Sequence, residues 1–216
     1  MRLAVLLSGR GSNFLAIHDA IARGVLDASI VAVISNRPDA PGLARARELG
    51  LPSFAIDHKA YATHAAHEAE VLRVLAESRP DYIALAGYMR LLSPAFVAAY
   101  PNRILNIHPS LLPAFPGVDA QAQALAYGAR VTGCTVHFVD VGTDTGPVIA
   151  QAVVPILSGD DRDALAARIL PHEHALLVRA LGWMAQGKVE VITSPGARPV
   201  VRVRGEHTFF GLETPP

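Results

Sequence analysis

Short apolar runs alternate with helix-like segments along the first half of this chain, and that alternation restricts the fold more than any other feature. The runs at 3–7, 29–34, 53–56, 82–86 and 103–107 predict strands that are apolar at successive positions. Helical spacing of apolar residues predicts helices at 13–23, 42–49, 63–78 and 94–100. Continuously apolar strands separated by helices indicate a parallel sheet that is covered on both faces.

The pattern changes in the second half of the chain. A helix is predicted at 120–127, and the loop DVGTDTG joins two long extended segments at 132–139 and 148–155. A long helix is predicted at 161–185, a hairpin at 189–193 and 200–204, and a loose tail at 209–216. The predicted fold class is therefore α/β: a Rossmann-like, mostly parallel twisted sheet with helices on both faces and antiparallel strands in the C-terminal half.

The composition excludes several classes of protein. Lys plus Arg and Asp plus Glu number 19 each, so the net charge indicates neither a nucleic acid nor an anionic membrane as a partner. The N-terminal apolar run is too short for a signal peptide, and no apolar run is long enough to span a membrane. The single cysteine, Cys134, excludes an internal disulfide and a cysteine-rich zinc site, and it fits a reducing, cytoplasmic location.

A glycine loop, SGRGSN at 8–13, follows the first predicted strand and leads into a helix. Ser12 and Asn13 can cap that helix, and the backbone N–H groups at a helix N-terminus favour an anion. Phe14 stands where the dinucleotide fingerprint has its third glycine, and no acidic residue ends the second strand, which disfavours NAD. Arg37 leaves NADP open and a turn without a ligand is a further alternative, but a mononucleotide or sugar phosphate fits best.

Two polar residues, Asn106 and His108, end a predicted apolar strand, and alternation places them on one face of it. They lie at the carboxyl end of a parallel strand, where open α/β sheets bind ligands. Asp140 and Asp144 could supply an acid, although either could be a simple turn residue. An amide and a charged imidazole stabilise an oxyanion, and an acid that raises the pKa of the imidazole can also accept a proton, so the set fits acyl transfer to an external nucleophile. Ser110 lacks a nucleophile-elbow pattern, which disfavours a covalent serine mechanism.

The remaining histidines have simpler interpretations. His172 and His174 are two apart in a predicted helix and cannot chelate one ion together. His64 and His67 could, but no third ligand is evident, so no metal site is predicted. His137 alternates with apolar neighbours in a predicted strand and is interpreted as a hydrogen-bonded packing residue.

Several stretches carry a resemblance to a known family. They are VLLSGRGSN at 5–13, AVISNRPDAPGLARA at 32–46, LAGYMRLLSP at 85–94, ILNIHPSLLPAFPG at 104–117, GCTVHFVDVGTDTGPVIAQ at 133–151 and EHALL at 173–177. In this order they resemble the phosphoribosylglycinamide formyltransferases, folate-dependent enzymes of purine biosynthesis. The resemblance implies transfer of the formyl group of 10-formyltetrahydrofolate to the amine of glycinamide ribonucleotide, which gives formylglycinamide ribonucleotide and tetrahydrofolate.

The resemblance also implies roles for individual residues. It makes Asn106, His108 and Asp144 the catalytic set. It assigns substrate binding to Gly11, Ser12, Asn13, Pro109 and Glu173. It assigns folate binding to His64, Met89, Arg90, Leu91, Leu92, Val139, Asp140 and Val141. The implied co-substrate is 10-formyltetrahydrofolate, with no metal and with small molecules as the only other partners of a monomer or homodimer.

The chain departs from the family pattern at three places. His64 stands where members often carry an arginine, residues 118–121 lack the histidine that many relatives have, and Leu170 replaces a common polar residue. These departures bear on binding contacts and leave the reaction type unchanged. We expect a single formyltransferase domain over 1–216, with a phosphate-binding half at 1–100, a catalytic and folate-binding half at 101–190, and a hairpin and tail at 190–216.

Three rival functions remain open. A formyltetrahydrofolate deformylase would use water as acceptor, and a methionyl-tRNA formyltransferase would use an aminoacyl-tRNA; each usually has an extra domain for which this chain offers little room. Neutral charge also disfavours tRNA. A non-catalytic phosphate or nucleotide sensor would keep the glycine loop but would not need the set Asn106, His108 and Asp144.

Overall fold

The structure is a computed structural model that describes residues 1–211, and the chain divides into two compact units, with the boundary between Asn106 and Ile107. The first unit contains β1 (Arg2–Leu7), α1 (Ser12–Ala22), β2 (Ser29–Ser35), α2 (Pro41–Glu48), β3 (Ser53–Ala55), the short 3-10 helix η1 (His58–Ala60), α3 (His64–Ser78), β4 (Tyr82–Leu85) and α4 (Pro94–Ala99). Strand β5 (Ile104–His108) begins in the first unit and ends in the second.

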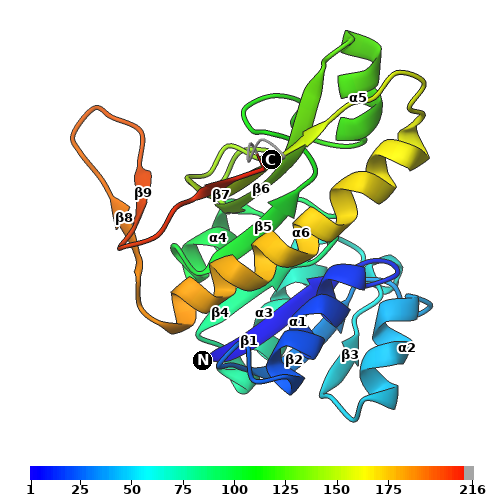
Figure 1. The fold of residues 1–216 in the computed structure, drawn as a ribbon. Coiled ribbons are helices and arrows are strands. Elements are labelled where there is room, and N and C mark those ends of the chain that lie inside the picture. The colour runs from blue at the N-terminus through cyan, green and yellow to red at the C-terminus, as the bar shows by residue number, and fades with distance from the viewer. Residues whose placement is uncertain (212–216) are drawn as a thin grey trace. The chain divides into compact units, whose positions relative to one another are not determined.

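The strands of the first unit form a parallel sheet (Figure 1). β1 pairs with β2 on one side and β4 on the other, β3 extends the sheet beyond β2, and β5 pairs with β4 up to the partners Leu85 and Asn106. Residues 3–7 of β1 have no exposed surface, which explains why their sequence is continuously apolar. The helices begin where the sequence supplies caps: the Thr63 hydroxyl accepts from the Ala66 N–H, and the Ser93 hydroxyl accepts from the Phe96 N–H.

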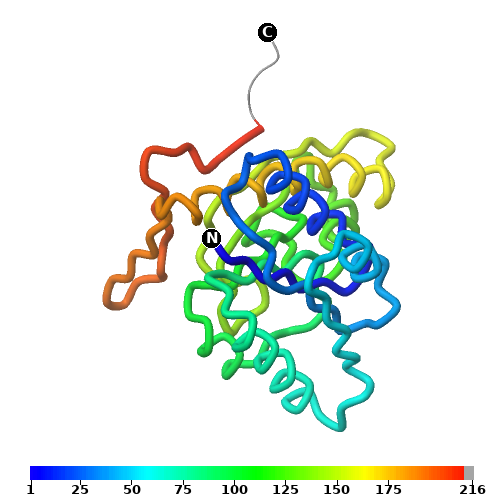
Figure 2. The backbone as a smooth tube through the Cα atoms, turned by 90° about the horizontal axis from the view of Figure 1, so that it is seen from below, coloured from blue at the N-terminus to red at the C-terminus, as the bar shows by residue number. Residues whose placement is uncertain are grey.

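The second unit continues with α5 (Ala120–Tyr127), β6 (Val131–Phe138), β7 (Val148–Pro155), α6 (Arg162–Ala185), β8 (Val189–Ile192), β9 (Val200–Val203) and β10 (Phe209–Phe210). β6 and β7 pair in the antiparallel sense, and α6 packs against both. β8 and β9 form a separate two-stranded hairpin, which stands away from α6 as the orange loop in Figures 1 and 2. This half therefore carries the antiparallel strands that the sequence predicts.

The predicted elements are confirmed to within one or two residues at each end, and the α/β fold class is confirmed. One prediction was wrong. The segment from Phe209 was expected to be loose, but β10 pairs in parallel with β7, and Phe210 stacks on Trp183 at a ring-centroid distance of 6.3 Å. The Arg179 guanidinium lies 4.4 Å from the centroid of the same ring, so long-range ring contacts order this end. The rest of the predicted tail, 212–216, lies outside the described residues.

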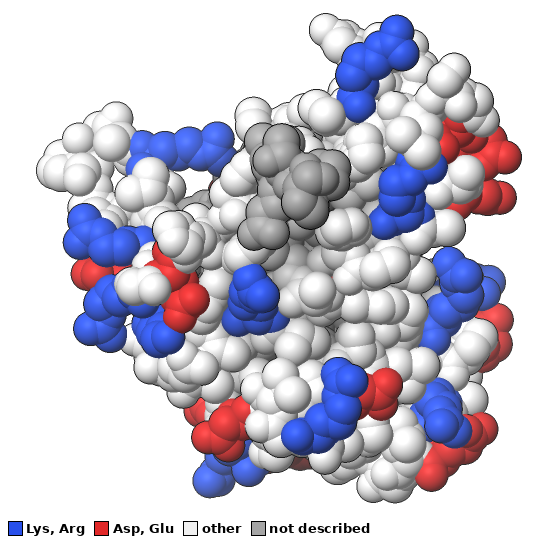
Figure 3. Space-filling view, viewed as in Figure 1, with Lys and Arg blue, Asp and Glu red and all other residues white. Residues whose placement is uncertain are grey.

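Surface charge agrees with the balanced composition. Blue and red side chains are interspersed over the face drawn in Figure 3. Within residues 1–211, no helix is long and apolar enough to cross a membrane. Over the same residues, no group of three or more His, Cys, Asp or Glu side chains is placed to hold a metal ion.

Candidate active site

The glycine loop of the first unit packs closely against the backbone at the start of α2. Gly11 has φ of 76°, and a Cβ atom built on it would lie 2.9 Å from the Cα of Gly42 at the start of α2. The Gly42 N–H also donates to the Gly9 carbonyl at 3.0 Å. The loop therefore needs glycine both for its backbone angle and for this approach. The predicted side-chain cap is not made: Gly11 is the N-cap of α1, and Ser12 is already the first helical residue.

The loop forms one wall of a pocket of about 460 Å³ that lies within the first unit. Residues 8–13, 36–37, 58, 86–87 and 89–90 contribute to its lining, and three of the lining residues, Arg10, Arg37 and Arg90, are cationic. Within residues 1–211, no carboxylate side chain lines the pocket. The first-turn N–H groups of α1 and the three guanidinium groups make it suitable for an anion. Of these cations, only Arg37 and Arg90 could be connected with a ligand from the sequence; Arg10 and the pocket residue His58 were missed.

The Ser8 hydroxyl links three of the backbone segments that line this pocket. The Ser8 hydroxyl donates to the Asn36 side-chain oxygen at 2.5 Å and accepts from the Met89 N–H at 2.8 Å. It thereby joins the ends of β1 and β2 to the loop that follows β4. Neither the position nor the residue type of Ser8 indicated this role in the sequence.

The predicted folate contacts of the first unit lie in that loop and at the start of α3. Met89 and Leu91 are 73% and 68% exposed, so two large apolar side chains face solvent close together in the chain. Among the described residues, Arg90 Nε is a buried donor with no hydrogen-bond partner. His64 lies 3.6 Å from the Glu68 carboxylate, which accepts from the Ser93 N–H at 2.8 Å. Leu92 is partly buried.

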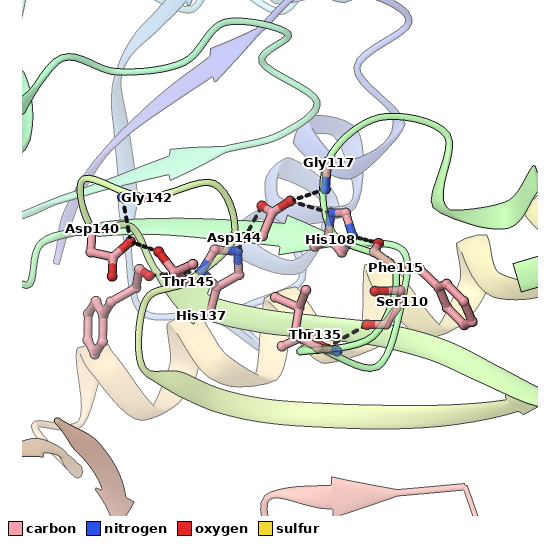
Figure 4. A network of polar contacts seen from close by, with 12 residues as sticks. His108, Ser110, Phe115, Gly117, Thr135, His137, Asp140, Gly142, Asp144 and Thr145 are labelled. Atoms are coloured by element: carbon pink, nitrogen blue, oxygen red, sulfur yellow. Dashed lines mark hydrogen bonds and ion pairs between the residues drawn. The ribbon is translucent and has the colours of Figure 1, made fainter. Parts of the chain in front are cut away.

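In the second unit, the loop after β6 folds back onto the end of β5 (Figure 4). The His108 side chain is 4% exposed; its Nδ1 lies 3.3 Å from Asp144 Oδ2, and its Nε2 lies 2.9 Å from the Phe115 carbonyl oxygen. Asp144 Oδ2 also accepts from the Gly117 N–H at 2.8 Å. The structure thus brings together two of the three residues in the predicted catalytic set.

A second imidazole faces the same carboxylate. His137, 2% exposed, lies with its Nε2 3.6 Å from Asp144 Oδ1, and its Nδ1 is 2.8 Å from the Phe138 carbonyl oxygen. Figure 4 shows the Asp144 carboxylate between the two rings. His137 is hydrogen-bonded, as its position in a strand suggested, but the interpretation as packing alone missed its contact with Asp144. The one available signal was that β6 leads directly into the loop.

Burial dominates the electrostatics of His108. It lowers the pKa of the imidazole below its ordinary value, while the Phe115 carbonyl and the Asp144 carboxylate act to raise it. The expectation that Asp144 raises the histidine pKa therefore holds for the pair but is outweighed by desolvation. Burial also acts to raise the pKa of Asp144, but hydrogen bonds from His137 and the Gly117 N–H outweigh it, and the pKa lies below its ordinary value.

The other candidate acid, Asp140, has a local role. Its carboxylate accepts from the Gly142 N–H at 3.1 Å and from the Thr145 hydroxyl at 2.6 Å, which closes the turn. Its neighbour Val141 is 69% exposed, and Val139 is partly buried. The ambiguity between the two aspartates is thereby resolved structurally: Asp140 shapes the loop, and Asp144 faces His108.

Thr135 holds the segment that follows β5. Its hydroxyl donates to the Ser110 carbonyl at 2.6 Å and accepts from the Leu112 N–H at 3.1 Å and from Gln151 Nε2 at 3.0 Å. The Ser110 hydroxyl donates to the Ala114 carbonyl at 2.5 Å and faces no base among its hydrogen-bond partners in residues 1–211. This geometry agrees with the interpretation of Ser110 as a structural residue.

The remaining predicted site residues are placed by their own elements. Asn106 is a partly buried residue of β5, two positions before His108 and therefore on the same face of the strand. Pro109 follows β5 directly. Glu173 is 9% exposed in α6, and its charge acts on Cys134 of β6.

Comparisons with known proteins support a family assignment. The sequence profile described as formyl transferase matches residues 1–181. The phosphoribosylglycinamide formyltransferase of Escherichia coli is 43% identical over 191 residues, which cover 88% of this chain and 90% of that protein. The trifunctional purine biosynthetic protein adenosine-3 of Drosophila melanogaster is 50% identical over 189 residues, and there the chain spans only 14% of the relative's length.

Solved structures agree. Glycinamide ribonucleotide transformylase 1 from Symbiobacterium toebii superposes with a TM-score of 0.88 at 45% identity and covers 94% of this chain and 93% of that one. A formyltetrahydrofolate deformylase from Pseudomonas syringae has a TM-score of 0.83 at 26% identity, and the match covers 94% of this chain and 65% of that one.

Proposed function

The chain belongs to the formyl transferase family, and from that premise we propose that it transfers the formyl group of 10-formyltetrahydrofolate to the primary amine of glycinamide ribonucleotide, a step of purine biosynthesis. The observation that carries this proposal is the contact of Asp144 with His108 at 3.3 Å, at the end of a strand that also presents Asn106. This set offers donors for an oxyanion and an acceptor for a proton, but no activated nucleophile of its own. The nucleophile therefore has to come from the acceptor.

The reaction begins when the amine nitrogen attacks the formyl carbon. The carbonyl electrons move to oxygen, and the amide of Asn106 and the Nε2–H of His108 stabilise the resulting oxyanion. In the structure that Nε2–H donates to the Phe115 carbonyl, which fixes the proton on Nε2 even when the imidazole is neutral. The oxyanion takes the place of the Phe115 carbonyl as its acceptor.

Asp144 is the proton acceptor of the reaction. It accepts the proton that the attacking amine loses, directly or through water, and its negative charge stabilises His108 as the imidazolium while the oxyanion exists. When the tetrahedral intermediate collapses, the carbonyl forms again and the bond from its carbon to N10 of the folate breaks. N10 then takes up the proton that Asp144 received from the amine, directly or through water. The products are formylglycinamide ribonucleotide and tetrahydrofolate.

Binding roles follow the chemistry of the site. The phosphate of the acceptor fits the pocket of the first unit, where Gly11, Ser12 and Asn13 offer backbone donors and Arg10 adds a cation. Pro109 and Glu173 are proposed to contact the ribose or glycinamide end. The exposed apolar side chains Met89, Leu91 and Val141 suit the pterin and benzoyl rings.

The other folate contacts proposed are Arg90, Leu92, His64, Val139 and Asp140. A single formyltransferase domain, a monomeric or homodimeric state and a cytoplasmic location stay predictions from the sequence.

The test is an assay of acceptor choice. Tetrahydrofolate release from 10-formyltetrahydrofolate is followed with glycinamide ribonucleotide, with water alone and with methionyl-tRNA as acceptors. We expect release to depend on glycinamide ribonucleotide and to yield its formyl derivative in equal amount. Equal rates with water alone would indicate a deformylase, and binding of both substrates without turnover would indicate a sensor; either result contradicts the proposal.

A further inference from the structure

The imidazoles of His108 and His137 contact different oxygens of the Asp144 carboxylate. Only His108 has a role in the proposed reaction. His137 approaches Oδ1 at 3.6 Å, and His108 approaches Oδ2 at 3.3 Å. Both rings are almost completely buried. A buried imidazole beside a catalytic carboxylate affects the charge of that carboxylate, whatever else it does.

The backbone determines which nitrogen of each ring carries a proton. A carbonyl oxygen can only accept, so His137 Nδ1 donates to Phe138 O at 2.8 Å, and His108 Nε2 donates to Phe115 O at 2.9 Å. In the neutral form of either ring, the other nitrogen carries a lone pair and faces an ionised carboxylate oxygen, which is also only an acceptor. Each contact is therefore attractive only when the ring, or Asp144 itself, holds one additional proton.

We propose that His137 is a positioning residue for formyl transfer: its imidazolium form holds the Asp144 carboxylate ionised and directed toward His108, so that the three side chains share their protons as one unit. His137 itself touches neither substrate in this proposal. It acts through Asp144, which also accepts from the Gly117 N–H at 2.8 Å. The inference rests on the proposed function for its kinetic consequences but not for its proton chemistry.

The electrostatics support this arrangement. A hydrogen bond from His137 is the leading influence that lowers the pKa of Asp144 against its burial, and the positive charge of His137 acts to lower the pKa of His108. Two further charged groups contact the loop next to the cluster: the Asp140 carboxylate accepts from the Thr145 hydroxyl, and the Arg198 guanidinium donates to the Thr145 carbonyl. Loss of His137 should therefore raise the pKa values of both Asp144 and His108.

Two substitutions separate the possible roles of His137. His137→Asn can keep a donor to the Phe138 carbonyl but removes the imidazole that faces Asp144 Oδ1. His137→Gln can place a neutral donor near Oδ1 but cannot carry the charge. His172→Asn, on the exposed side of α6 and outside the cluster, is the control.

We expect His137→Asn to lower kcat about 10- to 100-fold, as loss of a charge-assisted contact does, with little change in KM for either substrate. His137→Gln should recover part of kcat. In both variants the limb of the pH–rate profile that reports the cluster should move to higher pH than in the wild type and in His172→Asn. A pH–rate profile that superimposes on that of the wild type would overturn the proposal. A fall in kcat together with a rise in KM, without a shift of the pH–rate profile, would also overturn it.

A measurement on the wild-type protein needs neither variants nor turnover. With ¹⁵N-labelled histidine, the ring-nitrogen shifts of His137 and His108 are followed between about pH 5 and 9, across the ordinary histidine pKa. We expect His137 Nδ1 to stay protonated throughout, because it donates to the Phe138 carbonyl, and His108 to titrate in a multi-step curve that is coupled to the other groups of the cluster. A single-step titration of His108 would overturn the shared-proton proposal even if formyl transfer is established, and a coupled titration would support it even if the acceptor proves different.

Discussion

Two threonines of β6 offer a direct test of how the segment after β5 is held. Thr135 and Thr132 are both almost fully buried in the same strand, at 0% and 1% exposure. The Thr135 hydroxyl makes three hydrogen bonds, to Ser110, Leu112 and Gln151. The Thr132 hydroxyl, by contrast, is one of the buried polar atoms in residues 1–211 that have no hydrogen-bond partner. The same substitution, threonine to valine, should therefore have opposite effects at the two sites.

The magnitude follows from what each change leaves behind. Thr135→Val leaves the Leu112 N–H and the Ser110 carbonyl without their partner in a buried region, and each orphaned group costs about 1–3 kcal/mol, so we expect a loss of about 2–6 kcal/mol in the free energy of unfolding. Thr132→Val removes a hydroxyl that is buried without a partner, so it should be neutral or stabilise the protein by about 1 kcal/mol. Because Ser110 and Leu112 directly follow the strand of His108, kcat should also fall in Thr135→Val but not in Thr132→Val.

Urea unfolding followed by the fluorescence of Trp183, the one tryptophan, gives the comparison. A lower midpoint at unchanged m value reports lost stability. Equal midpoints for the two variants would refute the reasoning, because they would show that the three hydrogen bonds of Thr135 contribute nothing beyond shape.

Three further predictions concern other parts of the chain. Burial raises the pKa of the Cys134 thiol to about 12, so a thiol reagent at about pH 8, near the ordinary cysteine pKa, should leave the folded protein unmodified and should label one thiol after denaturation; prompt labelling would contradict this. Burial lowers the pKa of His67 below its unfolded value of about 6.5, so the unfolded chain binds more protons and stability should fall as pH drops through that value; His67→Gln should flatten this dependence in pH-resolved melts, and an unchanged slope would count against it. A Cβ on Gly146 would lie 1.8 Å from the Phe138 carbonyl oxygen, so Gly146→Ala should displace the Asp144 loop and abolish formyl transfer, whereas Gly182→Ala, which meets nothing within 4 Å in α6, should keep activity and raise the melting temperature; equal activities would refute the steric argument.

Local periodicity was enough to predict most of the fold. The boundaries of α5 and β7 agree with prediction residue for residue, because Gly128 ends the helix and because an apolar extended run ends at Pro155. β10 could not be predicted in this way. Two phenylalanines near the chain terminus carry no period, and their order depends on Trp183, Arg179 and β7, which lie far away in the sequence.

In the candidate site, too, local pattern predicts some features, and the others depend on contacts between distant residues. Alternation in β5 was sufficient to place Asn106 and His108 on one face. Whether Asp140 or Asp144 meets His108 depends on the path of a loop, and neither residue type nor spacing determines that path. His137 was misjudged for a related reason: a histidine among apolar neighbours in a strand has the same sequence pattern whether its ring packs against carbon atoms or faces a carboxylate.

Only part of the pocket in the first unit could be predicted from the sequence. The glycine loop indicated an anion from sequence alone, because helix N-termini offer free N–H groups. Arg10 and His58 were not connected with it, since their convergence depends on where β1, β2 and the segment around η1 end relative to one another. The hydrogen bonds of the Ser8 hydroxyl to Asn36 and Met89 could not be predicted from the sequence either.

In the proposed reaction, the end of β5, supported by Asp144, catalyses formyl transfer to an amine. The test is the kcat for formylation of glycinamide ribonucleotide by His108→Ala, measured beside His172→Asn as a surface control on α6 and with folding verified by circular dichroism. Loss of one donor to an oxyanion costs about 100- to 1000-fold in kcat, so we expect a loss of that size for His108→Ala and a kcat near that of the wild type for His172→Asn. A folded His108→Ala variant that formylates glycinamide ribonucleotide at a rate near that of the wild type would show that His108 does not stabilise the oxyanion.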